Sequence, residues 1–429
     1  MISGNLSRST PHSAYLNREI CTMDELAING GEKAKTVPYN QPNKYTDEER
    51  ELLLEVLDSG KLMGPDGKVA DFEAEICRAF EVKHAIMVTS GTVALQTALA
   101  ALGVSEGDEV ITTPMTDFGT TAAILALHAI PIFSDIDLST RLLDPQKVRE
   151  KITDKTRVII TVHMAGMPCD MDAFLEISEK TGVKILEDCA QAHGATYRGR
   201  FVGAIGHAAG FSMNESKQIS TGDGGFVTTN DDETAEIARL FRDKTYLRGQ
   251  KLERGVQPIP FFGTNLRPTC LQAAVAIAQL HKLEYLVARR DQIVRRYYAE
   301  LGDLPHLDFP KIADNVHPSW WPLAIRYTGS APTRDELVNI FRAEGISINT
   351  SMSAVKNILR TEVIQKRKYY PLTDDIPIFW QNTVYNPDDC PNVDTLQATC
   401  LRLPVNERYT DEDIDQTIAA VKKVWAHYF

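Results

Sequence analysis

The sequence predicts an α/β fold whose larger part holds a mostly parallel, seven-stranded sheet flanked by helices. From about residue 84, seven short runs rich in β-branched and aromatic residues alternate with helical stretches. The runs are almost wholly apolar, which is typical of strands buried on both faces of a parallel sheet. The chain of 429 residues suits about two domains rather than one core. The predicted strands are HAIMVTS, DEVITTP, IPIFSDID, RVIITVHM, VKILED, AAGFSM and GFVTTN.

Helices are predicted before, between and after these strands. Thr46 and Glu49 have the spacing of a capping box, and ERELLLEVLDSG continues with helical periodicity. VALQTALAALG and TTAAILALHA follow the first two strands. A long helical region from Leu271 to Leu301 is expected to lead out of the large domain.

The remaining chain has the mixed pattern of a smaller α+β domain. Residues 352–396 are rich in Pro, Asp, Tyr and Asn and fit either an active-site flap or a surface excursion. Trp320 and Trp321 are expected in the core of this domain. Its predicted elements are strands at WWPLAIRY and ISINTS and helices at RDELVNIFRAEG and TDEDIDQTIAAVKKVW. The predicted division is a polar arm (1–27), a large domain (28–290) and a small C-terminal domain (291–429).

Composition narrows the classes of partner. The net charge of −12 provides no basic surface for nucleic acid. No apolar run approaches the roughly 18 residues that span a bilayer, and the N-terminus lacks a signal-peptide pattern. The seven cysteines are scattered without a CxxC pair, which argues against a disulfide framework or a zinc site. We therefore expect a cytoplasmic protein without a metal, membrane or nucleic-acid partner.

Lys217, in FSMNESKQISTGDGG, is the main candidate for chemistry. A lysine amine becomes a nucleophile when its pKa is lowered, and the glycine-rich turn lets the backbone approach a ligand closely. This pattern is consistent with a covalently held carbonyl cofactor. A solvated lysine before a hairpin is the alternative, because GDGG is itself a good turn sequence.

Three further features follow predicted strands, where ligands of α/β sheets collect. The turn from Thr89 to Thr92 opens a helix and could bind a phosphate, or could be an ordinary N-cap. Asp188 could pair with a protonated ring nitrogen, or could cap a helix. Phe118 could stack on a ring, or could belong to the core.

The order of these features resembles fold-type I pyridoxal-phosphate enzymes, and within them the DegT/DnrJ/EryC1/StrS family of sugar aminotransferases. The resemblance covers about residues 28 to 425. It rests on SGTVAL (90–95), GDEVITTP (107–114), PIFSDID (131–137), ILEDCAQAHGA (185–195), FSMNESKQISTGDGG (211–225) and GTNLRPTCLQAAVAIAQLHKLE (263–284).

The resemblance implies a role for each matching residue. Lys217 would bind pyridoxal 5′-phosphate as a Schiff base, and Asp188 would pair with its ring nitrogen. Gln191 would lie near the phenolic oxygen of the ring, and Phe118 would stack on it. The phosphate would be held by Ser90, Gly91, Thr92 and Ser212.

The resemblance also implies a homodimer with shared active sites. Asn265 would reach the phosphate bound by the neighbouring subunit, and Arg267 would stabilise that loop or meet substrate. The donor would be glutamate or glutamine, and the acceptor a nucleotide-linked keto sugar or a keto-cyclitol such as an inosose. Such reactions belong to the biosynthesis of amino sugars and aminocyclitols for antibiotics or polysaccharides.

Departures from the family pattern remove no catalytic group. GDGG replaces the usual GEGG, MTDFG replaces an aromatic-rich turn, and His207 replaces a common Asp. His163, His193 and His207 lie near strand ends and could assist proton transfer, although a structural role is favoured.

Two other functions compete with amination. A keto-sugar dehydratase of the same family would carry a histidine at position 217, where this chain has lysine. A non-catalytic regulator on the same fold would be expected to lack Lys217, Asp188 or Ser212, and all three are present.

Overall fold

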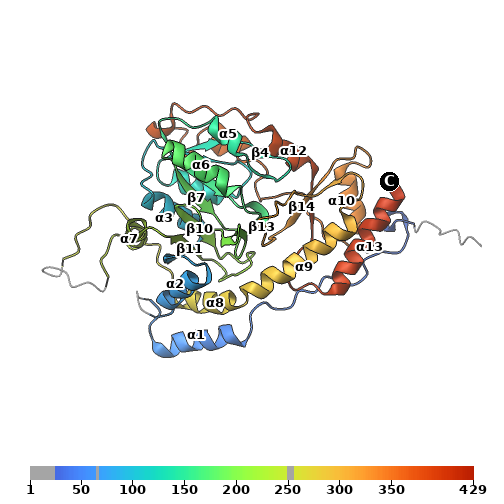
Figure 1. Ribbon diagram of the computed structural model, residues 1–429, viewed down its shortest axis with the longest axis horizontal. Helices are drawn as coiled ribbons and strands as arrows, with labels where there is room; N and C mark the ends of the chain where they lie inside the picture. Colours follow the sequence, from blue (N-terminus) through green and yellow to red (C-terminus); the bar gives the residue numbers. More distant parts are fainter. Residues whose placement is uncertain (1–24, 64–66, 249–255) are drawn as a thin grey trace, which may run out of the picture.

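The computed structural model describes residues 25–63, 67–248 and 256–429, so the predicted arm 1–27 lies almost wholly outside the described residues. The predicted seven-stranded sheet is confirmed (Figure 1). Its spatial order is β1-β11-β10-β7-β6-β2-β3. The strands are β1 (His84–Val88), β2 (Glu109–Thr112), β3 (Ile130–Phe133), β6 (Thr156–Val162), β7 (Lys184–Asp188), β10 (Ala208–Ser212) and β11 (Gly225–Thr229).

Only β11 runs against its neighbours in this sheet; it pairs antiparallel with both β1 and β10. The pairs β10–β7, β7–β6, β6–β2 and β2–β3 are parallel. Asp188, the last residue of β7, is therefore in register with Val162 on one side and Gly210 on the other. Because parallel strands end at one edge, the residues that follow them converge there.

Helices lie beside the sheet in three groups. α3 (Gly91–Ala101) contacts both α4 (Phe118–Leu125) and α7 (Asp232–Arg242), and all three contact strands of the sheet. A second group joins α2 (Lys68–Ala79) and α1 (Asp47–Ser59) to α8 (Cys270–His281). α5 (Pro145–Arg149) packs on α6 (Met171–Thr181), which contacts β7.

The predicted long helical region is two helices, α8 and α9 (Leu283–Leu301), that meet at Lys282. Figure 1 shows α9 leading from α8 toward α10 and α13 at the other end of the molecule. There α10 (Arg334–Ala343), α12 (Pro391–Thr399) and α13 (Asp411–Tyr428) accompany an antiparallel sheet of β12 (Leu307–Asp308), β14 (Leu323–Tyr327) and β15 (Cys400–Leu403). The boundary at residues 290/291 stays a prediction, since α9 continues through it.

One predicted strand is wrong. ISINTS (346–351) forms only an isolated bridge, from Asn349 to Arg402, on the side of β15 away from β14. Sequence analysis did not identify β15. The short elements are β4 (Ile136–Asp137), β5 (Leu142–Leu143), β8 (Thr196–Tyr197), β9 (Arg200–Phe201), β13 (Val316–His317), α11 (Glu362–Gln365) and single turns at Ala27–Asn29, Met164–Gly166, Ile358–Arg360 and Ile378–Trp380.

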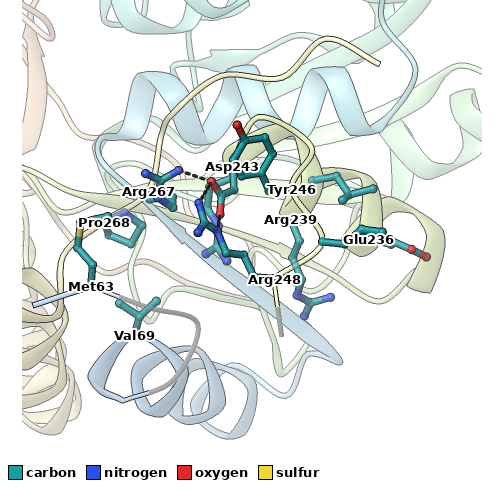
Figure 2. Close-up of a pocket in the computed structure, with 12 residues that line it drawn as sticks. Met63, Val69, Glu236, Arg239, Asp243, Tyr246, Arg248, Arg267 and Pro268 are labelled. Carbon is teal, nitrogen blue, oxygen red and sulfur yellow. Dashed lines mark hydrogen bonds and ion pairs between the residues drawn. The ribbon is translucent and has the colours of Figure 1, made fainter. Parts of the chain in front are cut away.

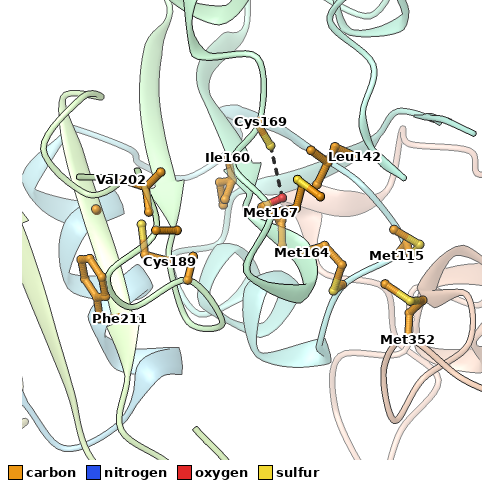
Figure 3. Close-up of a cluster of buried hydrophobic side chains, with 14 of the residues drawn as sticks. Met115, Leu142, Ile160, Met164, Met167, Cys169, Cys189, Val202, Phe211 and Met352 are labelled. Carbon is orange, nitrogen blue, oxygen red and sulfur yellow. Dashed lines mark hydrogen bonds between the residues drawn. The ribbon is translucent and has the colours of Figure 1, made fainter. Parts of the chain in front are cut away.

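The unassigned segment 352–396 folds back on the large sheet. Ile358 N donates to Pro114 O at 3.0 Å, and the Tyr385 hydroxyl donates to Pro131 O at 2.8 Å. Figure 3 shows Met352 from this segment beside Met115 and Met164 of the large domain, in the continuous apolar core. Within the described ranges, no helix has both the length and the apolar character needed to cross a membrane.

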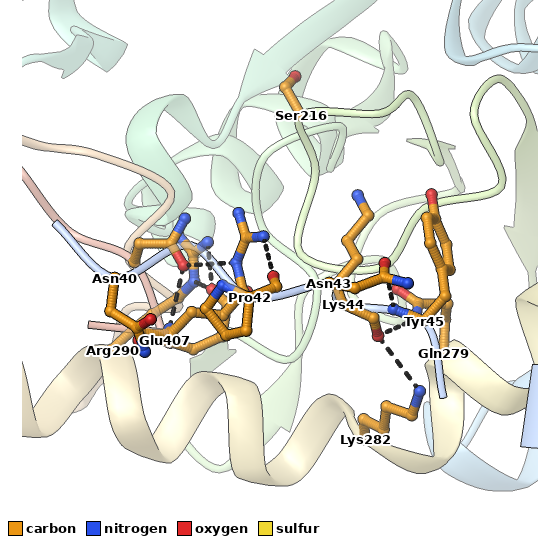
Figure 4. A network of polar contacts seen from close by, with 12 residues as sticks. Asn40, Pro42, Asn43, Lys44, Tyr45, Ser216, Gln279, Lys282, Arg290 and Glu407 are labelled. Atoms are coloured by element: carbon orange, nitrogen blue, oxygen red, sulfur yellow. Dashed lines mark hydrogen bonds and ion pairs between the residues drawn. The ribbon is translucent and has the colours of Figure 1, made fainter. Parts of the chain in front are cut away.

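The predicted capping box at Thr46 and Glu49 is confirmed, and Glu49 does more than cap α1. Its buried carboxylate accepts from Lys282 Nζ at 2.5 Å and from Gln279 Nε2 at 2.7 Å. Figure 4 shows the segment Asn40–Tyr45 lying along the helix that carries these two residues. Burial acts to raise the pKa of Glu49, but hydrogen bonds from Lys282, Gln279 and Thr46 outweigh it and lower the pKa to about 2.

We predict that Glu49→Gln lowers the free energy of unfolding by about 1–3 kcal/mol at neutral pH, because Lys282 loses its charged partner. A carboxyl that is more acidic when folded stabilises above its unfolded pKa of 4.5 and loses that effect as pH falls toward about 2. The loss should therefore shrink across this window in urea titrations followed by circular dichroism. Glu51→Gln, on the exposed side of α1, is the matched control. An equal loss at pH 7 and pH 3 would contradict the assignment.

Candidate active site

The turn after β1 meets the end of β10. Ser90 is the N-cap of α3, and its side chain accepts from Val93 N at 3.4 Å. The first backbone N–H groups of a helix have no partner within it and carry the positive end of the helix dipole. A Cβ placed on Gly91 would lie 2.6 Å from the Ser212 Cβ, so only glycine lets Ser212 approach this helix end. Gly225 is equally constrained, since a Cβ there would lie 2.5 Å from Ser90 O.

Asp188 lies beside this turn and is buried. Its Oδ2 accepts from Thr120 Oγ1 at 2.8 Å, and its Oδ1 accepts from Ala190 N at 3.1 Å. Burial raises the pKa of Asp188 although Thr120, Ala190 and the charge of Lys217 act to lower it. The nearby donors and positive charges are therefore too few to offset the burial of the Asp188 carboxylate.

Glu187, the preceding residue, provides the contrast. It is fully buried, but it accepts from His163 Nε2 at 3.0 Å and from the backbone N–H groups of Gly203, Ile205 and Gly206 at 2.7–2.9 Å. These bonds outweigh burial and hold its pKa below the usual value. Successive side chains of a strand point to opposite faces, so the two acids occupy separate environments. Of these two acids, only Asp188 lacks enough hydrogen bonds and nearby positive charge to offset its burial.

Lys217 follows β10 in a tightly tethered loop. Lys44 Nζ donates to Glu215 O at 2.6 Å, and Tyr45 Oη donates to the Glu215 carboxylate at 3.0 Å. Gln218 donates to Gln191 O at 2.9 Å and is buried. Burial lowers the pKa of Lys217, against the attraction of Asp188 and Asp117. Lys217 thus lies in surroundings that disfavour its charged form, and its role in chemistry stays a prediction.

Trp321 corrects an expectation. Trp320 is buried as predicted, but Trp321 is only half-buried and lies at the lysine. The Lys217 Nζ lies 4.2 Å from the centre of its indole ring, and its Nε1 donates to Ser216 O at 2.6 Å. Among the described residues, Lys217 forms no ion pair, and this aromatic face favours its charge together with the more distant attraction of Asp188 and Asp117.

Phe118 and Gln191 lie at the same edge of the sheet. Phe118 begins α4 and is partly buried, with Thr120 two residues further in contact with Asp188. A Cβ on Gly119 would lie 2.7 Å from the Thr92 Oγ1, which links this helix to the Ser90–Thr92 turn. Gln191 Oε1 accepts from Ala165 N at 2.8 Å. The structure thus gathers every predicted cofactor residue except Asn265.

Asn265 lies apart from this group and is exposed. It bridges to Asp243, on which Arg248, Lys244 and Arg267 converge (Figure 2). Arg267 therefore braces this loop through Asp243, one of the two roles expected for it. Burial acts to raise the pKa of Asp243, but Arg248 and Arg267 hold it below the usual value.

The three histidines have structural partners. His163 lies between Glu187 and Cys169 N, and His207 Nδ1 accepts from Ile185 N at 3.0 Å. His193 is buried, and burial lowers its pKa to about 3. His163, Glu187 and Cys189 offer three potential metal ligands within 4.8 Å of one another, but the Glu187 oxygens are already taken by four donors.

The cofactor that the resemblance implies fits these residues. The Gly91 and Gly225 positions leave a helix N-terminus and Ser212 open to a phosphate. Asp188 is an acid in need of a cation, as a protonated ring nitrogen would supply. Lys217 is an amine with a lowered pKa close to that acid.

Three features of the site were not predicted from the sequence. They are Thr120, Trp321 and the contacts of Lys44 and Tyr45 with Glu215. Thr120 is two residues beyond Phe118 in one helix, so a pattern of site residues on α4 could have suggested it. No sequence signal distinguishes Trp321 from Trp320.

Comparisons with known proteins identify the family of the chain. The sequence profile described as the DegT/DnrJ/EryC1/StrS aminotransferase family matches residues 43–352 and 347–422. The spore coat polysaccharide biosynthesis protein SpsC of Bacillus subtilis is 32% identical over 396 residues, 90% of this chain and 97% of that protein. GDP-perosamine synthase of Caulobacter vibrioides is 33% identical over 88% of this chain and 95% of its own length.

A cyclitol enzyme is similarly related. A putative L-glutamine:3-amino-2,3-dideoxy-scyllo-inosose aminotransferase of Streptoalloteichus tenebrarius is 35% identical over 75% of this chain and 79% of its own length. Among solved structures, an aminotransferase from Psychrobacter cryohalolentis superposes with a TM-score of 0.80 at 29% identity, over 91% of this chain and 99% of that one.

We predict that Thr120→Val weakens the site while leaving the fold intact, because Asp188 loses its side-chain donor in a buried setting. A charged hydrogen bond of about 1.5–3 kcal/mol corresponds to a fall in kcat/KM of roughly 10–100-fold. Steady-state kinetics and retention of the cofactor on dialysis would measure this. Thr120→Ser keeps the donor and should stay within about threefold of wild type. If the valine variant matched wild type, Thr120 would have no role at Asp188.

Proposed function

The chain belongs to the DegT/DnrJ/EryC1/StrS aminotransferase family, and on this premise we propose how its residues transfer an amino group. It is a pyridoxal 5′-phosphate-dependent aminotransferase that moves the amino group of glutamate or glutamine to a keto sugar or a keto-cyclitol. The observation that carries the assignment of the site is the buried, under-compensated Asp188 beside Lys217.

Each cofactor group has a matching residue. Ser90, Gly91, Thr92 and Ser212 would hold the phosphate, and Phe118 would lie against the ring. Asp188 would pair with the ring nitrogen, Gln191 would lie near the phenolic oxygen, and Lys217 would bind the cofactor covalently. When bound, pyridoxal 5′-phosphate supplies a carbonyl that accepts the amino group and a ring that withdraws electrons.

Lys217 is proposed as the base that moves the proton at the donor α-carbon. A general base works best when its pKa lies near the working pH, and burial lowers that of Lys217 from its usual value. The tethers on Glu215 and Ser216 limit the positions that the lysine can take. Asp188, whose burial is only partly offset by its neighbours, would favour a cationic ring.

The dehydratase alternative predicts histidine at position 217, and the regulator alternative predicts loss of a site residue. Neither fits Lys217, Asp188 and Ser212 together. Both nucleotide-sugar and cyclitol enzymes occur among the relatives, so the acceptor is proposed at the level of a keto sugar or keto-cyclitol. The pathway would be amino-sugar or aminocyclitol biosynthesis.

We further propose a homodimer with shared active sites in the cytoplasm. Asn265 is exposed in one chain and remote from the residues gathered around Lys217. Near it in sequence, Val256 and Phe262 expose 69% and 83% of their surface, as residues that pack against a second copy would. The described cysteines are all unpaired, in keeping with a reducing compartment.

We predict that borohydride reduction of the purified holoenzyme fixes the cofactor to Lys217, because burial lowers the pKa of this amine and the charge of Asp188 acts on it. Peptide mapping by mass spectrometry would locate the label. Lys217→Ala should lose turnover by several orders of magnitude with an unchanged circular dichroism spectrum. A label on another lysine, or turnover retained by the alanine variant, would overturn the role of Lys217.

The acceptor can be identified by a screen. Protein that has taken up the amino group from glutamate or glutamine is mixed with nucleotide-linked keto sugars and with inososes. The compound that restores the absorbance of the aldehyde cofactor is the acceptor. Failure with both classes would exclude the proposed acceptors.

A further inference from the structure

The indole of Trp321 lies at the proposed catalytic amine, although Trp321 belongs to a distant part of the chain. The Lys217 Nζ lies 4.2 Å from the centre of this ring. That distance is within the roughly 6 Å over which an aromatic face attracts an ammonium group, and indole is the best of the side-chain rings for this. A neutral amine gains no such attraction. The ring therefore distinguishes the two protonation states of Lys217.

Hydrogen bonds hold the indole in this place. Its Nε1 donates at 2.6 Å to the carbonyl of Ser216, which precedes Lys217 in the chain. The backbone N of Trp321 donates to Ala165 O at 2.9 Å, and the Trp321 carbonyl accepts from Arg290 at 3.0 Å. These partners come from three separate segments, so the position of the ring is set before a substrate arrives.

The backbone on both sides of this contact is strained. Trp320 has a φ of 52° and Ala165 a φ of 61°, in the left-handed region that residues other than glycine seldom occupy. Such conformations reduce stability and persist where the surrounding structure enforces them, commonly at functional sites. The two consecutive indoles diverge here. Trp320 is buried beside Tyr298, with the ring centres 6.3 Å apart, whereas Trp321 reaches Lys217.

We propose that Trp321 is a positioning residue that holds Lys217 while the lysine carries the proton of the amino donor. This inference rests on the proposed function, in which Lys217 is the base. The C–H bond at the donor α-carbon breaks, its electron pair stays on the carbon side, and the proton bonds to the lone pair of Nζ. The resulting ammonium group is attracted by the indole face. The proton then leaves Nζ for the cofactor carbon that bears the transferred amino group, and Nζ is neutral again.

The charges around Lys217 suit a group that is neutral first and cationic later. Burial lowers the pKa of Lys217, against the attraction of Asp188 and Asp117, so the neutral amine that a base requires is favoured. Among the described residues, Arg402 is the other cation at this indole, with its Cζ 5.6 Å from the ring centre, and it offers an ammonium group no attraction. A carboxylate in place of the ring would keep the amine charged throughout, whereas the weaker attraction of a ring leaves both states accessible.

Two substitutions separate the aromatic face from the hydrogen bond to Ser216. Trp321→Phe and Trp321→Leu both lose the Nε1 donor, but only phenylalanine keeps a ring. In stopped-flow absorbance of the holoenzyme with saturating glutamate or glutamine, Trp321→Leu should slow amino-group uptake by roughly 2–30-fold. Trp321→Phe should fall between leucine and wild type. The α-deuterated donor should react more slowly than the ordinary donor in all three proteins, which places the loss in the C–H step.

Chemical labelling measures the charge of Lys217 without turnover. In the full chain freed of its cofactor, the extent of acetylation of Lys217 by acetic anhydride across a pH series is followed by mass spectrometry. Because the ring favours the ammonium form, its loss should lower the labelling midpoint of Trp321→Leu by about 0.4–1.5 pH units. Trp320→Phe is the matched control, since it loses a similar indole donor, to Asp291 at 3.1 Å, and should keep the wild-type midpoint.

The outcomes distinguish this inference from the proposed function. If wild type takes an amino group from neither glutamate nor glutamine, the proposed function fails and this role fails with it. If wild type is active and the leucine and phenylalanine variants are equally slow, the bond to Ser216 is responsible, and only the role of the indole face is overturned. An unchanged rate or an unchanged labelling midpoint in Trp321→Leu would also overturn it. If the leucine variant does not fold, Trp321→Met provides the non-aromatic comparison.

Discussion

The burial of the Asp188 carboxylate is the constraint on which the site depends. β7 ends with two adjacent acids, and the pleat directs them to different surroundings. Glu187 accepts hydrogen bonds from His163 and three backbone donors, so its role is in the fold. Asp188 has only Thr120 and Ala190 and keeps a raised pKa. A cation supplied by a ligand would complete its environment, which links binding of the cofactor to the stability of this edge of the sheet.

The part of the site around Trp321 depends on the small domain being held in a fixed position beside Lys217. Arg290 of α9 pairs with Glu407 at 2.6 Å and also donates to the carbonyls of Trp320 and Trp321. This buried ion pair thereby connects α9 to the loop after β15 and to Trp321, whose indole lies beside Lys217. Removing one partner of such a pair is costly because the other charge remains buried. The position of Lys217 therefore depends on contacts made by both domains.

The sequence predicted the structure best where short-range patterns define the strands of the sheet and the residues that follow them. The seven strands, the Thr46 capping box and the residues that end strands follow from short-range patterns, and the parallel order brings Asp188, Ser212 and the Ser90 turn together. It predicted least well the contacts between residues that are far apart in the sequence. Trp321 and Arg402 approach Lys217 from more than 100 residues away, and nothing local distinguishes Trp321 from Trp320. ISINTS has the composition of a strand, but it makes only one bridge to β15, and how far such a segment pairs depends on tertiary structure.

Asp188 and Arg402 are charges of opposite sign near Lys217, and neither charge is fully compensated by the described residues. Pairing them with each other would remove both costs, but the Trp321 indole lies beside the guanidinium and the acid ends a strand of the other domain. A ligand set with a cationic ring and an anionic carboxylate would satisfy both at once. Selection for the fold alone would favour their replacement by neutral residues, since buried unpaired charges reduce stability. Their joint presence is therefore better explained by the chemistry at Lys217 than by the packing of either domain.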